Sequence, residues 1–460
     1  MSENKNSSGS ELNRKSNGSS ANKEHLTRLE IYWILYDVGN SAFVLLVATI
    51  LPIYFNYLAD SAGISEVDYL AYWGYAASVA TIAVALIGPV LGSIADTQNY
   101  KKPLFTICMM IGVIGCAALS VPTSWIIFLA VFVVAKIGFN ASLIFYDSML
   151  TDITTEDRFD SVSSSGYAWG YIGSCIPFVI SLVFVLLYDS IGITFRTAMT
   201  IAFFLNAAWW LLVTLPLLKN YKQTHFAAES TPGQAGSESL SGQGNNASGI
   251  VSDTTQKTSL VRGSFSRLGH TFAEIFRQKN IFYYLLAFFF FIDGVYTIID
   301  MATAYGSALG LDSTGLLLAL LVTQIVAFPF ALIFGRLSKS FRTDQLIRFC
   351  IGAYTFIALF AIQLDRQWEF WLLAVCVGMF QGAIQALSRS YFAKIIPPEK
   401  SGEYFGIYDI FGKGASFMGT FLVGVVAQIT GLANAGVAVL AVLFVIGFLL
   451  FGKAAKLNRV

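Results

Sequence analysis

An aspartate, an asparagine and a serine lie near the start of a long apolar segment. The segment WILYDVGNSAFVLLVATILPIYF runs from Trp33 to Phe55 and contains Asp37, Asn40 and Ser41. A carboxylate at bilayer depth costs at least about 2.5–3.5 kcal/mol, so intramembrane charges mark substrate or ion pathways by default. These residue types therefore predict a polar cavity that binds a substrate or a coupling ion.

Similar polar residues recur in other apolar segments at helical spacing. Asp293 and Asp300 are seven residues apart, so both face the same side of a helix, and Asp147 shares a face with Lys136. We expect the substrate or coupling-ion site to be formed by Asp37, Asn40, Ser41, Lys136, Asn140, Asp293, Tyr296, Asp300, Gln381 and Gln385. The alternative is that these groups only pair between helices and hold the bundle together.

A second set of residues lies near the ends of the apolar segments. The loop GSIADTQNYKK, from Gly92 to Lys102, has a weaker counterpart, GRLSKSFR, from Gly335 to Arg342. Residues expected to make gating or cytoplasmic loop contacts are Gly92, Asp96, Lys101, Lys102, Arg336, Arg389, Asp409 and Lys413. We expect Asp96 to make contacts that favour one access state. Asp409 and Lys413 are four residues apart and can also simply pair with each other.

Lys136 is predicted to lie near the middle of the membrane. It is about 18 Å from the outer end of its segment, and Asp293 lies at a similar depth from the other side. A lone lysine there would be costly or would lose its proton. We expect Lys136 to pair with Asp293, or failing that with Asp300 or Asp37, in at least one access state. Otherwise it would anchor an anionic group of the substrate directly.

The composition is that of a membrane protein. The chain is 55% hydrophobic and only 12% charged, with a mean hydropathy of +0.64. Apolar runs long enough to cross the bilayer as helices recur throughout. We predict twelve spans at residues 30–57, 69–95, 103–120, 124–150, 163–188, 195–218, 281–307, 314–338, 345–364, 368–394, 404–428 and 432–452.

The basic residues and the repeated pattern predict the domain organisation. Lys and Arg concentrate in the N-terminal tail, the alternate loops and the C-terminal tail, which places both termini in the cytoplasm. We predict an all-α membrane protein with two pseudo-symmetric six-helix bundles, residues 30–218 and 281–453. A disordered tail would occupy residues 1–29, a largely disordered cytoplasmic linker residues 219–280, and a C-terminal tail residues 454–460. The stretch 227–256 is rich in Gly, Ser and Gln, which is typical of a flexible linker.

The sequence gives no support to several other classes. A net charge of +1 offers no reason to propose nucleic acid as a partner. The five cysteines lie in apolar runs, and we find no metal-ligand cluster, nucleotide-binding loop or nucleophile elbow, so no cofactor is expected. Two alternatives to a transporter remain at this stage. One is an integral-membrane enzyme; the other is a non-transporting sensor whose cytoplasmic linker is the output domain.

The loop from Gly92 to Lys102 resembles the signature loop of the major facilitator superfamily. Gly92, Asp96, Lys101 and Lys102 match its pattern, whereas Thr97 replaces the usual basic residue. Two further segments, LYDVGNSAF from residue 35 and FQGAIQALSRSYFAKIIPPEKSGEYFGIYDIFGKGAS from residue 380, resemble the vacuole-effluxer branch of that superfamily. Its best-known members are autophagy-related vacuolar amino-acid effluxers.

That resemblance implies a function and a fold. It implies a twelve-helix transporter in which helices one, four, seven and ten line a central cavity. It also implies export of amino acids or similar small solutes. Our own leading interpretation of the intramembrane charges is a secondary active transporter that works by alternating access. We expect it to act as a monomer, with a small-molecule substrate, a coupling proton or cation and the lipid bilayer as its partners. The short outer loops, which contain no glycosylation sequon, favour the bacterial inner membrane; in a eukaryote the vacuolar membrane is expected. The chain departs from the family pattern at Lys136, Asp147 and Asp409, where uncharged polar residues are typical.

Overall fold

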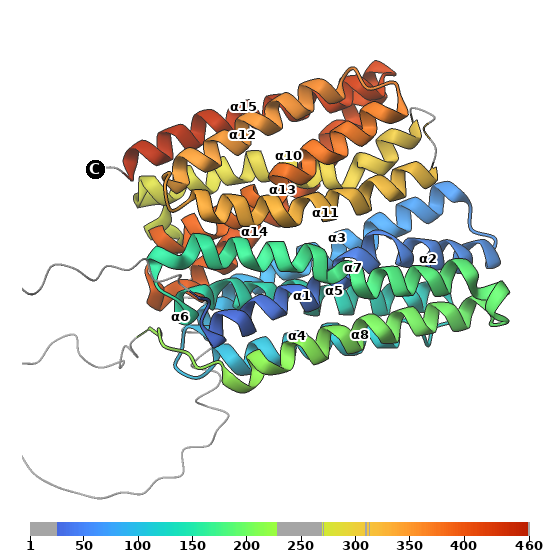
Figure 1. The fold of residues 1–460 in the computed structure, drawn as a ribbon, viewed down its shortest axis with the longest axis horizontal. Coiled ribbons are helices and arrows are strands. Elements are labelled where there is room, and N and C mark those ends of the chain that lie inside the picture. Colours follow the sequence, from blue (N-terminus) through green and yellow to red (C-terminus); the bar gives the residue numbers. More distant parts are fainter. Residues whose placement is uncertain (1–24, 228–268, 270, 309–310, 312, 459–460) are drawn as a thin grey trace, which may run out of the picture.

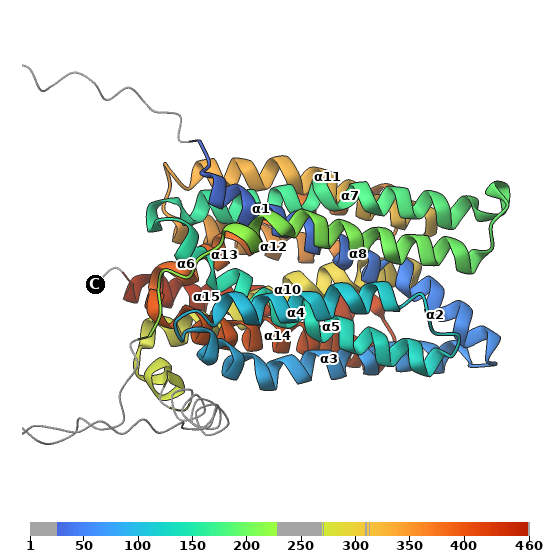
Figure 2. The ribbon, with the colours of Figure 1, turned by 90° about the horizontal axis from the view of Figure 1, so that it is seen from below.

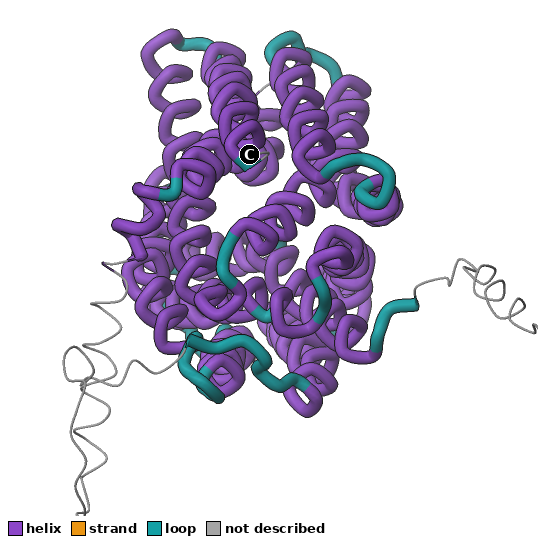
Figure 3. Tube along the Cα trace, turned by 90° about the vertical axis from the view of Figure 1, so that its left-hand side faces the viewer, coloured by secondary structure: helices purple, strands orange, loops and turns teal. Residues whose placement is uncertain are grey.

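All regular elements in the described part of the chain are helices (Figure 3). The computed structural model describes residues 25–227, 269, 271–308, 311 and 313–458. Within these residues, twelve helical segments are long and apolar enough to cross a membrane, which confirms the predicted number. Because a backbone in lipid must satisfy its own hydrogen bonds, long apolar runs of this kind fold as helices.

The first half of the chain forms one bundle, drawn in blue to green in Figure 1. Its helices are α1 (Arg28–Ala48), α2 (Ile50–Ser61), α3 (Glu66–Ala95), α4 (Lys101–Ala118), α5 (Trp125–Ser148), α6 (Leu150–Ile153), α7 (Phe159–Ile191) and α8 (Phe195–Asn220). The first predicted span is two helices, because the backbone leaves the helical region at Thr49. Pro52 in the first turn of α2 has no N–H to continue the hydrogen bonding of α1.

The second half forms the other bundle, drawn in yellow to red. Its helices are α10 (Lys279–Ala308), α11 (Ser313–Leu337), α12 (Thr343–Ala361), α13 (Gln367–Ile395), α14 (Ser401–Thr430) and α15 (Ala433–Leu457). The halves meet where α3 packs against α14 and where α7 packs against α11 and α13. Figure 1 shows α7 beside α11 along this boundary.

The beginning of α1 and the end of α15 lie at the same end of the molecule (Figures 1 and 2). We call this end the terminal face. The first span runs from this face to the opposite end and α3 returns, so the connection from α3 to α4 also lies at the terminal face. The start of α14 lies beside it, since Asp96 accepts a hydrogen bond from the first turn of α14. The even number of spans explains why both ends of the chain emerge on one face.

The described ends of the linker pack against the bundle. Residues 221–227 run without helix along the connection between α3 and α4, and residues 271–277 are helical. Gln223 donates a hydrogen bond to the carbonyl of Ala95, and the N–H of Ala227 donates to the carbonyl of Asp96. We call residues 221–227 the strap. The predicted flexible stretch, apart from Ala227, lies outside the described residues.

Candidate functional site

Arg389 of α13 forms ion pairs with two aspartates of the other half. Its Nη2 lies 3.4 Å from Oδ2 of Asp37 on α1, and its Nη1 lies 3.0 Å from Oδ1 of Asp147 on α5. The Arg389 side chain is only 2% exposed. A buried guanidinium needs charged partners and hydrogen-bond acceptors to offset the loss of water. Arg389 therefore joins the two halves through one desolvated cluster.

The remaining donors of Arg389 are also used. Its Nε donates to Oγ of Ser163 over 2.9 Å, and its Nη2 donates to the carbonyl of Ser163 over 3.1 Å. The guanidinium lies 4.6 Å from the ring centroid of Trp33 and 4.5 Å from that of Tyr167, in cation–π contacts. Gly166 makes room for the cluster, since a Cβ there would lie 2.5 Å from Oδ2 of Asp37.

Asp160 at the start of α7 forms a second charged connection between the halves. Its Oδ2 accepts from Nζ of Lys394 and from Oγ1 of Thr343, each over 2.6 Å. Its Oδ1 accepts from Oγ of Ser390, also over 2.6 Å. The carboxylate is buried, and its described partners all belong to the other half. Separating the halves at this point would expose or unpair this carboxylate.

Asp96 binds the N-terminus of α14 across the same boundary. Its Oδ1 accepts from the N–H of Gly402 over 2.7 Å, and its Oδ2 accepts from the N–H of Glu403 over 2.8 Å. The first N–H groups of a helix have no partner within it and carry partial positive charge, so a carboxylate stabilises them. Gly92 and Gly402 lie so close that a Cβ on Gly92 would collide with the carbonyl of Gly402. Both glycines allow the backbones of α3 and α14 to approach.

Burial raises the pKa of Asp96 from 3.8 to about 7, although Lys101 and the two N–H groups act in the opposite direction. A structure in which Asp96 is buried therefore binds a proton more readily than one in which Asp96 is exposed. By linkage, the contact gains stability as the pH falls from above 7 and loses stability as the pH rises through 7.

We expect acidification to increase the population closed at the terminal face, measured by spin-label distances between the halves at pH 5 to 9. Asp96→Asn, which cannot titrate, should flatten this dependence. An unchanged pH profile in Asp96→Asn would contradict the assignment to Asp96.

Lys101 and Asp152 form a completely buried ion pair under the strap. Nζ of Lys101 lies 3.0 Å from Oδ2 of Asp152, and both side chains are 0% exposed. The same Nζ donates to Oγ of Ser401 at the start of α14, over 3.0 Å. From the strap, Tyr221 donates its hydroxyl to Asp152 over 2.6 Å, and the N–H of His225 donates over 2.8 Å. The strap thus holds the carboxylate that orients Lys101 toward the other half.

Asp409 and Lys413 pair along α14, as their spacing allows. Nζ of Lys413 lies 2.6 Å from Oδ1 of Asp409. That Nζ also donates to the carbonyl of Asn140 on α5, over 3.3 Å. The pair is therefore local, but it too contacts the other half.

Asp293 lies between α10 and α14. Its Oδ1 accepts from the N–H of Gly419 over 2.8 Å and from Oγ1 of Thr297 over 3.4 Å, while its buried Oδ2 has no hydrogen-bond partner. Among the described residues no ion pair joins it to Lys136. Nζ of Lys136 instead lies 5.6 Å from the ring centroid of Phe132. Pairing of Lys136 with Asp293 stays a prediction for another access state.

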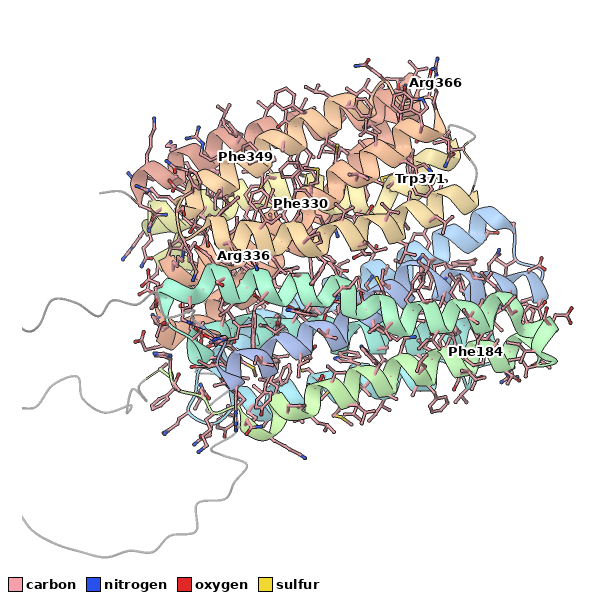
Figure 4. The ribbon with its side chains drawn as sticks, viewed as in Figure 1. Phe184, Phe330, Arg336, Phe349, Arg366 and Trp371 are labelled. Atoms are coloured by element: carbon pink, nitrogen blue, oxygen red, sulfur yellow. The ribbon has the colours of Figure 1, made fainter. Side chains whose placement is uncertain are left out.

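The remaining predicted residues differ in burial and in their contacts. Asn40 donates to the carbonyl of Tyr36 and to Asp37, so it supports the Arg389 cluster. Gln381 and Gln385 are buried on α13. Those that are partly or fully exposed are Ser41, Lys102, Tyr296, Asp300 and Arg336. Figure 4 shows Arg336 beside the boundary between the halves, toward the terminal face.

Sequence reasoning missed several residues of these contacts, among them the charged residues Asp152, Asp160 and Lys394. The two acids lie in TDITTEDRFDSVSS, between the fourth and fifth spans. One signal could have identified the two acids: the predicted topology places them at the same membrane surface as the loop from Gly92 to Lys102. A carboxylate in a short loop at a membrane surface is normally solvated, so its burial depends on the packing of the other half.

The sequence profile described as "Vacuole effluxer Atg22 like" matches residues 27–458. The chain belongs to this family. An uncharacterized MFS-type transporter of Bacillus subtilis, YxiO, is 39% identical over 93% of this chain and 95% of its own length. Autophagy-related protein 22-1 of Aspergillus niger is 25% identical over 62% of this chain, and the match spans 45% of that longer protein.

Solved structures show the same fold. The proton:xylose symporter XylE has a TM-score of 0.64 at 11% identity, covering 93% of this chain and 94% of XylE. FucP in its outward conformation has a TM-score of 0.63 at 12% identity, covering 93% of this chain and 99% of FucP. The Atg22-like chain is therefore a multi-pass transporter of the major facilitator superfamily and not an enzyme.

Proposed function

We propose that the protein exports amino acids or similar small polar solutes by alternating access, as a secondary active transporter. The observation that carries this proposal is the concentration of charged contacts between the halves at the terminal face. Arg389, Asp160, Asp96 and Lys101 each contact the opposite half there. Groups of this kind can exchange partners or water when the halves separate, so they suit a gate that opens and closes.

The terminal face is proposed to be cytoplasmic, and the membrane to be the cell membrane. The excess of Lys and Arg in the tails and alternate loops supports this orientation. The relative from Bacillus subtilis is a bacterial protein and is consistent with a bacterial cell membrane. The fungal relative is named as an autophagy-related protein. In this orientation the structure would be closed toward the cytoplasm.

The charged residues within the membrane-spanning helices suit a solute that carries both a positive and a negative group. Lys136 of α5 would supply a cation for a carboxylate group of the solute. Asp293 supplies a carboxylate with one oxygen that has no hydrogen-bond partner. A coupling proton or cation would use the same kind of group, since binding neutralises a charge that is costly in the membrane.

The test is solute flux in proteoliposomes. We expect vesicles containing the purified protein to exchange radiolabelled amino acids, applied singly, faster than empty vesicles, and an imposed pH gradient to change the rate if a proton is coupled. Lys222→Gln, an exposed change on the strap, serves as the active control. Absence of flux for every amino acid, with the protein shown to be folded, would contradict the proposed substrate class.

A further inference from the structure

A groove lies on the surface of the second half, away from the contacts described above. It has a volume of about 700 Å³ and lies along α12, bordered by α13 and α15. Phe349 and Phe356 of α12 line it and are 60% and 75% exposed, respectively. Figure 4 shows Phe349 on the second half, in the part nearer the terminal face. The lining is mostly apolar and aromatic.

Gly352 creates the hollow of this groove. It lies between Phe349 and Phe356 on the same face of α12, and a Cβ placed on it would meet nothing within 4 Å. Glycine inside a helix costs about 1 kcal/mol relative to alanine, and no close contact with a neighbouring helix requires it here. The space above Gly352 is therefore open to whatever surrounds the protein at this depth.

Arg348 supplies a positive charge at the side of the groove. Its guanidinium lies 4.7 Å from the ring centroid of Phe448, which holds it against α15. Within the described residues it has no carboxylate partner. Arg348 lies about 8 Å from the start of α12, and side chains on a helix point back toward the N-terminus, here toward the terminal face. The guanidinium can therefore reach the level of the lipid headgroups.

We propose that this groove binds one anionic phospholipid. Its phosphate would pair with Arg348, and one acyl chain would lie over Gly352 between the two exposed phenylalanines. The charge decides for an anionic headgroup, because the cation of Arg348 attracts a lipid with net negative charge, whereas a zwitterionic headgroup carries a cation of its own. Arginine can bind the phosphate itself through two parallel hydrogen bonds. The apolar lining of the groove favours a lipid over a free phosphate ion, because an acyl chain can cover it and an ion cannot. This site does not depend on the proposed transport activity.

The experiment measures lipid retention by the purified full-length protein. Phosphatidylglycerol or phosphatidylcholine with identical acyl chains is added in detergent, and bound lipid is counted by native mass spectrometry while the thermal unfolding midpoint is recorded. We expect phosphatidylglycerol to bind about fivefold more tightly, the effect of one arginine near a membrane surface. It should also raise the unfolding midpoint more than phosphatidylcholine does.

Two variants and a control separate the contributions. Arg348→Gln should remove the preference for phosphatidylglycerol, and Gly352→Leu should fill the groove and reduce retention of both lipids. Lys222→Gln removes an exposed positive charge from the strap, outside the groove, and should retain the full preference. The proposal is overturned if Arg348→Gln keeps the preference, if both lipids bind equally to the unmodified protein, or if inorganic phosphate alone reproduces the stabilisation.

Discussion

Replacing Arg389 by alanine is expected to lower the free energy of unfolding by about 3–5 kcal/mol, the typical cost of breaking a buried ion pair from one side. Asp37 and Asp147 would then lose the cation that each contacts in the structure. The measurement is equilibrium unfolding of the purified protein in mixed SDS and detergent micelles. Spin labels on the two halves should also show a wider terminal face.

Two comparisons make the Arg389 prediction specific. Arg366→Ala removes an arginine that is 69% exposed and whose described ion pair is with exposed Asp365, at the opposite end of the molecule (Figure 4). Its loss should cost about 1 kcal/mol or less. Adding Asp37→Asn and Asp147→Asn to Arg389→Ala should restore part of the stability, because the unpaired charges are removed. A cost for Arg389→Ala no larger than that for Arg366→Ala would contradict the structural assignment.

The number of spans could be predicted because it depends on local properties. Length and hydropathy identify a helix in lipid without knowledge of its neighbours, and the twelve predicted spans are present in the described chain. Even the break at Thr49 has a local cause, in Pro52. Linker residues 221–227 are different. The sequence places them in a largely disordered linker, whereas their course along the bundle depends on Asp152 and on the carbonyls of Ala95 and Asp96.

The partners of the charged residues could not be predicted in the same way. Asp37 was expected to face the cavity, with Lys136 as one candidate cation, but its cation in the structure is Arg389, which lies 352 residues away in the sequence. Asp293 was the first candidate partner for Lys136 and instead accepts the N–H of Gly419 on α14. Depth along a helix can be estimated from the sequence, whereas the direction of a side chain around the bundle depends on packing.

Replacing Lys101 by methionine is the second change expected to have a large effect. It would leave Asp152 buried without its amine partner and remove the hydrogen bond from Lys101 to Ser401. The expected loss is again about 3–5 kcal/mol in the free energy of unfolding, measured in the same micelles. The adjacent Lys102→Met is the matched control, because Lys102 is partly exposed and its side chain has no described ion pair. Its effect should stay within about 0.5 kcal/mol.

Hydrogen exchange in the strap provides a second measurement for the Lys101 prediction. Tyr221, Thr224 and His225 all bond to Asp152, so its position and that of the strap depend on each other. Without Lys101 the uncompensated carboxylate would draw water into the contact, and the backbone amides of residues 221–227 should exchange hydrogen faster. Asp152→Asn in the Lys101→Met background should recover part of the lost stability, since it removes the charge and keeps an oxygen acceptor for the strap. If the two substitutions instead give strictly additive losses and the strap exchanges at its original rate, then Lys101 and Asp152 act independently, and the ion pair does not link the strap to the start of α14.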